Sequence, residues 1–169
     1  MSDPLRPLRV NAVELLRQPG TLRPVTTTID GAALDVVHDA LDGDVEVDLE
    51  LESTNDGIDV RGEVIAPWTG SCRRCLAPVA GRAVVDVDER YQRELTDDDA
   101  YLIEQHQLDL TPMARQLVLL ELDDERLCRP DCAGLCPVCG IDRNSASCEC
   151  DTTVRDDRWA ALDGLVLDD

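Results

Sequence analysis

The stretch Val45-Glu46-Val47-Asp48-Leu49-Glu50-Leu51 alternates apolar and acidic residues without a break. Successive side chains of a β-strand point to opposite faces, so this pattern predicts a strand with one apolar and one acidic face. A second apolar segment, residues 58–65, follows across the turn-like sequence 53–57 and predicts a hairpin with the first strand. The residues expected to point into the core are Val45, Val47, Leu49 and Leu51.

Two further segments extend the predicted sheet. Residues 21–29 are rich in threonine and other β-branched residues, which favour strands. Residues 83–91 alternate again, with Val85 and Val87 on one side and Asp86 and Asp88 on the other. The sheet is therefore expected to be mainly antiparallel, with one strongly acidic face.

A helix is expected to cover the apolar face of this sheet. Thr111 is a suitable N-cap and Pro112 a suitable first helical residue, so residues 111–122 are predicted to be helical. The apolar stripe expected to pack on the sheet is formed by Met113, Leu117 and Leu120, with Val118 as a further candidate.

The remaining segments have weaker patterns. Short helices are expected over residues 11–16 and 158–162, and a loop over residues 95–108. Two parts of the chain follow: an α+β sheet domain over residues 1–126, and a cysteine-rich module with a short terminal helix over residues 127–169.

The composition is strongly acidic. The 169 residues carry a formal net charge of -20, and all 16 basic residues are arginine. Such a surface repels phosphate backbones, whereas nucleic-acid-binding proteins usually have the opposite sign of charge. The acidity either keeps the chain soluble or attracts a basic partner. The acidic sheet face is accordingly either a solvated surface or a docking surface, whose candidate contacts are Glu46, Asp48, Glu50, Asp86 and Asp88.

The first ten residues and the lack of a long apolar run favour a cytoplasmic protein. Residues 1–10 carry arginines but no apolar segment of the kind found in signal peptides, and the apolar run 117–120 is too short to cross a bilayer. In the reducing cytoplasm, clustered cysteines are metal ligands more often than disulfides.

The chain has eight cysteines, and six of them fall within residues 128–150. Cys136-Pro137-Val138-Cys139-Gly140 has the C-x2-C spacing that lets two thiolates reach one ion from a tight turn, and its glycine permits the positive φ that closes such a turn. Cys148 and Cys150 can supply two more thiolates from a second turn. One zinc site is therefore predicted from Cys136, Cys139, Cys148 and Cys150.

The second C-x2-C turn, Cys72 to Cys75, is left with Cys128 and Cys132. A Zn²⁺ ion held by these four cysteines would join the sheet to the C-terminal module across more than fifty residues. A rival partition places Cys132 with the knuckle and leaves another cysteine free. Cys72 and Cys75 could also be small buried hydrophobic residues, or a C-x2-C pair could be a redox-active dithiol.

Four arginines near the cysteines allow an alternative function. Arg73, Arg74, Arg129 and Arg143 either offset the negative charge of the thiolates or contact the phosphates of RNA. Nothing in the chain indicates an enzyme: phosphate-binding loops and nucleophile elbows are missing from the sequence, and both histidines lie outside the cysteine clusters. The expected fold is thus α+β, with a mainly antiparallel β-sheet, a covering helix and a C-terminal zinc-bound cysteine-rich module.

Several motifs together resemble the YceD family, also called DUF177, in its cysteine-rich form. They are Cys72-Arg73-Arg74-Cys75-Leu76, an acidic strand, the helix start at 108–112, the block 127–140 with its Leu-Cys-Pro-x-Cys-Gly core, and Cys148, Cys150 and Asp151. The resemblance covers most of the chain from Asn11 onward.

The resemblance implies a function that composition does not. The family is associated with the accumulation of large-subunit ribosomal RNA, and its gene often neighbours that of a small basic zinc-ribbon ribosomal protein. It implies a non-enzymatic factor in ribosome biogenesis, whose partner would be a basic large-subunit ribosomal protein or a pre-ribosomal particle. It also implies that Cys72, Cys75, Cys128 and Cys132 are the older metal site. Direct RNA binding and thiol redox chemistry are the alternatives.

Overall fold

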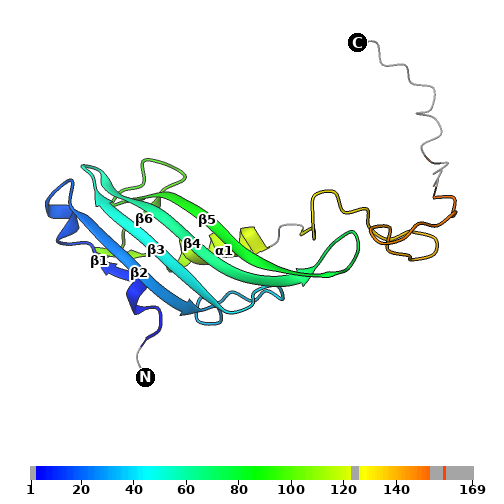
Figure 1. Ribbon diagram of the computed structural model, residues 1–169. Coiled ribbons are helices and arrows are strands. Elements are labelled where there is room, and N and C mark those ends of the chain that lie inside the picture. The colour runs from blue at the N-terminus through cyan, green and yellow to red at the C-terminus, as the bar shows by residue number, and fades with distance from the viewer. Residues whose placement is uncertain (1–2, 123–125, 153–157, 159–169) are drawn as a thin grey trace, which may run out of the picture.

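The computed structural model describes residues 3–122, 126–152 and 158. One sheet dominates it, with the strand order β2-β3-β4-β5-β6 (Figure 1). All neighbouring strands are antiparallel except β5 and β6, which are parallel. The expected α+β fold with a mainly antiparallel sheet is confirmed. The strands are β2 (Leu22–Asp30), β3 (Asp44–Ser53), β4 (Gly57–Ser71), β5 (Pro78–Gln92) and β6 (Tyr101–Leu102).

The β3–β4 hairpin has the predicted alternation. Val47 pairs with Val64, and Leu51 pairs with Val60. The four apolar residues of β3 that were predicted to face the core are at most 2% exposed. The strands β4 and β5 are longer than predicted, because they continue past the start of β3 as an arm whose last pair is Ser71 with Pro78. Along part of this arm, residues 40–42 also pair with β4, through the bridge between Leu41 and Trp68.

The helix α1 (Thr111–Leu122) lies behind the sheet and packs against β4 and β5 (Figure 1). Its stripe differs in part from the prediction. Leu117 is only partly buried and Leu120 is 65% exposed, so the predicted contact of Leu120 with the core is wrong. The residues that a helix presents on one face recur every three or four positions, and here the buried set includes the predicted Met113 and Val118 but not Leu120. It consists of Met113, Ala114, Val118 and Leu122.

Two of the weaker predictions are wrong. Residues 11–16 do not form one helix: β1 (Arg9–Asn11) lies between the 3-10 helices η1 (Arg6–Leu8) and η2 (Leu15–Arg17). β1 pairs with β7 (Gln107–Asp109), so the predicted loop 95–108 contains β6 and the start of β7. This small second sheet packs over the main core through Val10 and Leu108, which are both buried.

The cysteine-rich segment extends away from the sheet, beyond the distal end of the β4–β5 hairpin (Figure 1). Its described residues, 126–152, form turns and one isolated bridge between Leu135 and Asp142. The predicted helix 158–162 lies outside the described residues except for Arg158. A domain boundary after residue 126 stays a prediction.

Candidate metal centre

The eight cysteines gather into two groups of four. Within each group, the sulfur atoms all lie within 4.8 Å of one another. Cys132 lies with the cysteines of the β4–β5 hairpin and not with the knuckle 136–140. The first quartet is Cys72, Cys75, Cys128 and Cys132, and the second quartet is Cys136, Cys139, Cys148 and Cys150.

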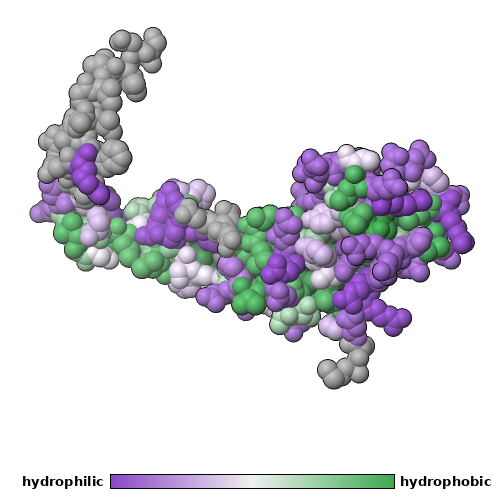
Figure 2. All heavy atoms as spheres, turned by 180° about the vertical axis from the view of Figure 1, so that it is seen from behind, coloured by the Kyte–Doolittle hydropathy of each residue, from purple (hydrophilic) through white to green (hydrophobic). Residues whose placement is uncertain are grey.

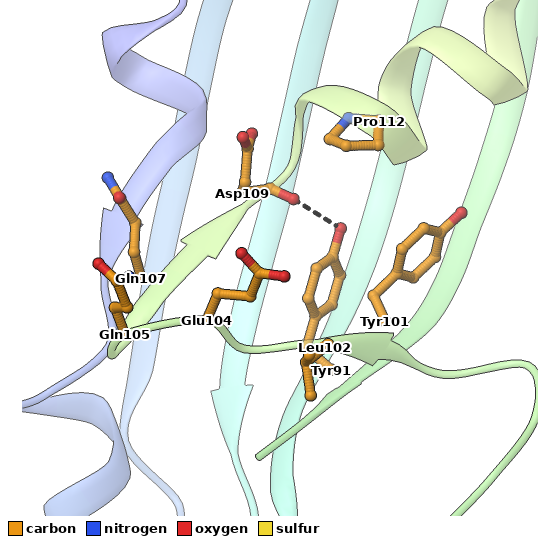
Figure 3. Close-up of a pocket in the computed structure, with 8 residues that line it drawn as sticks. All are labelled: Tyr91, Tyr101, Leu102, Glu104, Gln105, Gln107, Asp109 and Pro112. Carbon is orange, nitrogen blue, oxygen red and sulfur yellow. Dashed lines mark hydrogen bonds between the residues drawn. The ribbon is translucent and has the colours of Figure 1, made fainter. Parts of the chain in front are cut away.

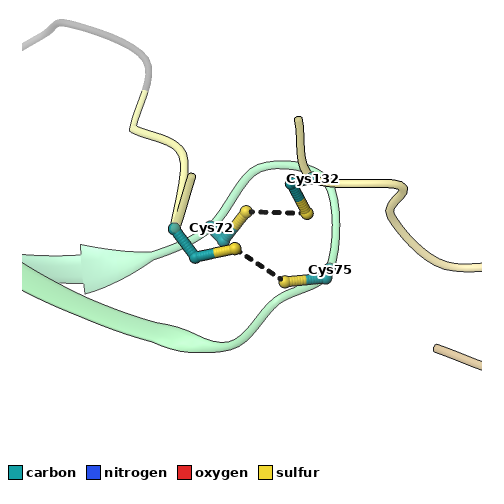
Figure 4. A group of neighbouring side chains, drawn as sticks. Cys72, Cys75 and Cys132 are labelled. Atoms are coloured by element: carbon teal, nitrogen blue, oxygen red, sulfur yellow. Dashed lines mark hydrogen bonds between the residues drawn. The ribbon is translucent and has the colours of Figure 1, made fainter. Parts of the chain in front are cut away.

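The sulfur spacing of the first quartet suits a tetrahedral metal ion. Zn–S bonds of about 2.3 Å in a regular tetrahedron place neighbouring sulfur atoms about 3.8 Å apart. The Sγ atoms of Cys72 and Cys132 are 3.8 Å apart, and those of Cys75 and Cys128 are 3.6 Å apart. Figure 4 shows Cys72 and Cys75 at the hairpin tip, with Cys132 approaching them from the cysteine-rich segment. Four soft thiolates with no histidine or carboxylate among them fit a closed structural site.

The β4–β5 hairpin supplies the first turn. The Cys72 amide donates to the Ala77 carbonyl at 2.8 Å, and the Leu76 amide donates to the Cys72 carbonyl at 2.8 Å. This tight turn gives Leu76 a φ of 60°, and its side chain is 65% exposed. The turn places Cys72, which is fully buried, beside Cys75 at the end of the β4–β5 arm.

The knuckle 136–140 repeats this turn. The Gly140 amide donates to the Cys136 carbonyl at 2.9 Å, and the Cys136 amide donates to the Ile141 carbonyl at 2.9 Å. Gly140 has a φ of 76°, which a residue without Cβ adopts at little cost. Neither C-x2-C turn opens a helix in the described residues, as a thioredoxin-type dithiol would.

The first cysteine of each turn is stabilised as a thiolate. Hydrogen bonds from backbone amides, first that of Cys128 and then those of Cys75 and Arg74, lower the pKa of Cys72 to about 6. The amides of Cys139 and Val138 lower the pKa of Cys136 to about 6 in the same way. Amides that point at a sulfur favour its charged form.

In each quartet, ionisation of one further thiol is strongly disfavoured. The Cys132 sulfur, together with burial, raises the pKa of Cys128 to about 12. The Cys139 sulfur and burial raise the pKa of Cys150 to about 12. Four thiolates therefore share one quartet only when a cation neutralises their mutual repulsion.

Asn144 connects the two quartets. It belongs to the loop between Cys139 and Cys148, yet its Nδ2 lies 3.5 Å from the Sγ of Cys132 and donates to it. Its Oδ1 accepts the Ala133 amide at 2.8 Å. A side chain from the loop of the second quartet thus orients a sulfur of the first.

Two arginines attach the cysteine-rich segment to the hairpin. Arg74 donates through Nη1 to the carbonyls of Pro130 and Cys132, at 3.2 and 3.0 Å. The Arg126 guanidinium lies 4.5 Å from the ring centroid of Trp68 in β4, a cation–π contact.

The four arginines proposed as RNA contacts belong to the turns and loops that carry the cysteines. Besides Arg74, Arg129 is held by Asn144 Oδ1 at 2.7 Å and by Asp131. The Arg73 amide donates to the Arg126 carbonyl, and the Arg143 amide donates to the Gly134 carbonyl. Arg74 and Arg129 are therefore used within the chain, which favours a structural role for them.

The acidic residues of the predicted docking face are all exposed, on the side of the sheet away from α1. The register of β3, β4 and β5 aligns Asp48, Glu63 and Asp86 in one row across three neighbouring strands. Glu63 was not predicted as a site residue. The alternation of β4, which buries Val60 and Val64 and exposes Glu63, could have identified it.

The outer surface is mixed in character. In the view from behind, polar residues cover much of the sheet domain, and hydrophobic residues reach the surface there and along the cysteine-rich segment (Figure 2). Among the described residues, no helix is long and apolar enough to cross a membrane.

Comparisons with known proteins place the chain in a family. The family model described as "Large ribosomal RNA subunit accumulation protein YceD" matches residues 60–166. An uncharacterized protein of Mycobacterium tuberculosis (strain ATCC 25618 / H37Rv) is 34% identical over 166 residues, covering 92% of this chain and 80% of the relative.

Two other relatives are less similar to this chain. An uncharacterized protein of Mycobacterium leprae (strain TN) is 29% identical and covers 80% of this chain and 67% of its own length. The uncharacterized protein YlbN of Bacillus subtilis (strain 168) is 26% identical over 72% of each chain. No solved structure matches the chain. The family model covers well over half of the residues, and the chain therefore belongs to the YceD family.

Proposed function

We propose that this protein is a non-enzymatic factor in the biogenesis of the large ribosomal subunit, and that its acidic sheet face binds a basic ribosomal protein. The partner would be free or already part of a pre-ribosomal particle in the cytoplasm. The observation that carries this proposal is the row of carboxylates formed by Asp48, Glu63 and Asp86, which make no ion pair with any residue that the structure describes.

The row stands out because other carboxylates on the same face are paired. Arg61 lies between Glu52, Asp59 and Asp88, at 3.2 to 3.3 Å from each. Arg82 pairs with Glu46 at 2.7 Å, and Arg90 pairs with Asp59 at 3.0 Å.

By contrast, among the described residues, the three carboxylates of the row and Glu50 have no arginine within ion-pair distance. Thr26 donates to Asp48 at 2.9 Å and leaves its negative charge in place. Such a concentration of one sign of charge accelerates the encounter with a basic protein and makes it dependent on salt.

The acidic face also narrows the class of partner. Ribosomal RNA carries a phosphate at every nucleotide and is repelled by this face. Basic ribosomal proteins have the complementary charge. The family description, which concerns accumulation of large ribosomal RNA, is consistent with a factor that acts on that RNA through a protein.

We further propose that both quartets hold Zn²⁺ and that the ions are structural. The donor set of four thiolates without an open position supports this assignment. The ions would fix the cysteine-rich segment against the hairpin. The role of the metal would then be mechanical, with the acidic face contacting the partner.

A pair of triple variants tests the docking face. The variant Asp48→Asn, Glu63→Gln, Asp86→Asn removes the row. The matched control Glu14→Gln, Glu94→Gln, Asp98→Asn removes the same charge from exposed residues elsewhere. Each would replace the native gene, and the ratio of large-subunit to small-subunit ribosomal RNA would be measured.

The row variant should lower the large-subunit ratio, and it should weaken binding to purified basic large-subunit proteins at low salt. The control should match the native protein in both assays. Equal behaviour of the two variants, or an unchanged RNA ratio in a strain that lacks the gene, would refute the proposed function.

A further inference from the structure

The outer edge of β5 is open over much of its length. β4 pairs with one side of β5 from Pro78 to Gln92, whereas β6 pairs with the other side only at Tyr91 and Gln92. Between the hairpin turn and β6, from Ala80 to Asp88, β5 forms the rim of the main sheet (Figure 1). We call this stretch the open edge.

The register decides which backbone groups of the open edge point outward. In an antiparallel pair, both polar groups of a residue point to the same side of the strand, and successive residues alternate. The Cys72 amide donates to the Ala77 carbonyl, so odd-numbered residues of β5 bond to β4 and even-numbered residues point away. Gln92 agrees with this alternation, since its carbonyl accepts the Ile103 amide at 2.8 Å on the outer side. The outward residues of the open edge are therefore Ala80, Arg82, Val84, Asp86 and Asp88.

These five residues present a row of backbone donors and acceptors to solvent. Each has an amide hydrogen, and their amides and carbonyls have no hydrogen-bond partner among the residues that the structure describes. Their side chains are exposed, and even the apolar Val84 is 52% exposed. An edge with these properties is a template for an additional strand.

Both ends of the open edge are closed, which limits what can bind there. At one end, the Tyr101 ring of β6 stacks on the Tyr91 ring with centroids 4.9 Å apart (Figure 3). At the other end, the chain turns at Ala77 into the first cysteine quartet. An antiparallel second copy that covered the whole open edge would bring its own Ala77 beside Tyr91, where β6 already lies. The edge therefore suits a short extended segment.

The charge of the open edge becomes negative toward β6. Arg82 already pairs with Glu46 at 2.7 Å, and Asp86 makes no ion pair with a described residue. Beyond Asp88, a cavity of about 260 Å³ has mainly carboxylates in its lining. Burial, followed by the charges of Asp88 and Asp99, raises the pKa of Glu89 there, which is consistent with a negative potential. The lining residues are Asp59, Asp88, Glu89, Arg90, Asp97 and Asp99.

We propose that the open edge binds an extended basic segment of the partner protein as an additional, antiparallel strand. Directly opposite residues of such a pair have their side chains on the same face. The segment would therefore place an apolar residue beside Val84 and basic residues beside Asp86 and Asp88. Main-chain hydrogen bonds would supply the affinity, and these side-chain pairs the specificity. The inference rests on the proposed function, which supplies a basic partner, and it adds a defined binding position next to the acidic face.

The test uses the full chain and a short peptide as the probe. The acetylated and amidated peptide Arg-Thr-Arg-Thr-Val-Thr-Glu-Thr can place its two arginines opposite Asp88 and Asp86, and its valine opposite Val84. It would be titrated into ¹⁵N-labelled protein and followed by NMR, with an expected Kd on the order of 1 mM.

The amide signals should report the alternation of the strand. The amides of Arg82, Val84 and Asp86 should shift and gain protection from hydrogen exchange when the peptide binds. The amides of Ala83 and Val85, which point to β4, should change much less.

Two methylated peptides separate strand addition from simple attraction of charge. N-methylation of the second arginine, the valine and the glutamate removes the amide hydrogens that would point at β5, so binding should weaken at least about tenfold. N-methylation of three threonines, whose amides would point away from β5, should weaken binding less than about threefold. Both peptides keep the same charge.

A variant of the protein makes the same distinction. Val84→Pro removes one outward amide hydrogen and no bond to β4, and proline is tolerated at such edge positions. It should weaken peptide binding about fivefold or more. The matched control Val84→Thr keeps the amide hydrogen and a β-branched side chain, so it should bind within about twofold of the native protein.

Three results would overturn the inference: equal binding of the two methylated peptides, no added protection at Arg82, Val84 and Asp86, or a dimer of the chain alone that Val84→Pro dissociates. The last result would assign the edge to a second copy of the chain. These results do not involve ribosomal RNA, so they leave the proposed function to its own test. Conversely, strand addition by the peptide together with an unaffected ribosomal RNA ratio would support the open edge and contradict the proposed function.

Discussion

The two cysteine quartets use the same turn but join different parts of the chain. The second quartet takes all its ligands from residues 136–150, so an ion there would organise only its own loop. The first takes Cys72 and Cys132 from positions 60 residues apart and so links the β4–β5 arm to the cysteine-rich segment. An ion in the second quartet would therefore maintain local structure, whereas an ion in the first would hold two parts of the fold together.

The turns also differ at the residue after the second cysteine. The backbone of each turn has a positive φ at this position. The residue there is Gly140 in the second quartet and Leu76 in the first. The first turn thus accepts backbone strain that the second avoids.

The largest expected effect comes from removing one ligand from each quartet. Cys72→Ser and Cys136→Ser should each lower the bound metal by one ion per chain, as measured by elemental analysis. Cys72→Ser should also cost several kcal/mol of unfolding free energy, because it releases a closed loop of more than fifty residues. Cys136→Ser should leave the sheet domain nearly as stable as before.

Thermal denaturation and limited proteolysis distinguish the two variants. Protease cleavage between residues 126 and 135 should appear in Cys72→Ser under conditions where Cys136→Ser is cut only after residue 135. Equal melting temperatures would contradict the assigned difference between the quartets.

The next effect concerns the link between the quartets. Asn144→Ala removes the donor to the Cys132 sulfur without touching a ligand, and such supporting contacts typically contribute 10- to 100-fold in metal affinity. The first quartet should therefore lose metal to a competing chelator at about 10-fold lower chelator concentration. Ser147→Ala, in the same loop and exposed, is the control. A loss confined to the second quartet would show that Asn144 serves only its own loop.

A smaller effect is expected at Arg74. Its guanidinium bonds to two carbonyls of the segment 130–132, one of them part-buried, so Arg74→Ala should destabilise the attachment by about 1–2 kcal/mol. Chemical denaturation measures this change. Arg143→Ala, whose side chain is exposed, should be close to neutral. If Arg74→Ala were also neutral, the arginine would be free to act elsewhere, and RNA contact would regain support.

The smallest effects test the strain in the two turns. Gly140→Ala should cost about 1 kcal/mol, because a Cβ is unfavourable at positive φ. Leu76→Gly should stabilise the folded state by up to about 1 kcal/mol, since the relief of strain exceeds the greater freedom of glycine in the unfolded chain. Destabilisation by Leu76→Gly would instead indicate that the exposed leucine side chain packs on its surroundings.

Local patterns predicted the main sheet well. In β3, strict alternation with no interruption leaves one orientation that buries the apolar residues. The spacing of the cysteines likewise indicated which thiols could share a turn, because two residues between ligands fix a tight loop.

The sequence did not predict the pairing of strands that are far apart along the chain. β1 and β7 have three residues each and are about one hundred positions apart, too short for a periodic signal. The prediction that Leu120 of α1 packs on the sheet was wrong. Leu117 and Leu120 are both apolar, so hydropathy alone does not indicate which of the two side chains faces the sheet.

One strand at the rim of the sheet has a consequence for self-association. β2 borders the sheet on one side, and Pro24 lies within it, opposite Glu50. A proline has no amide hydrogen to offer to an incoming strand, so the rim is a poor template for further β-strands. Pro24 thus makes this rim less able to add a strand from a second copy of the chain.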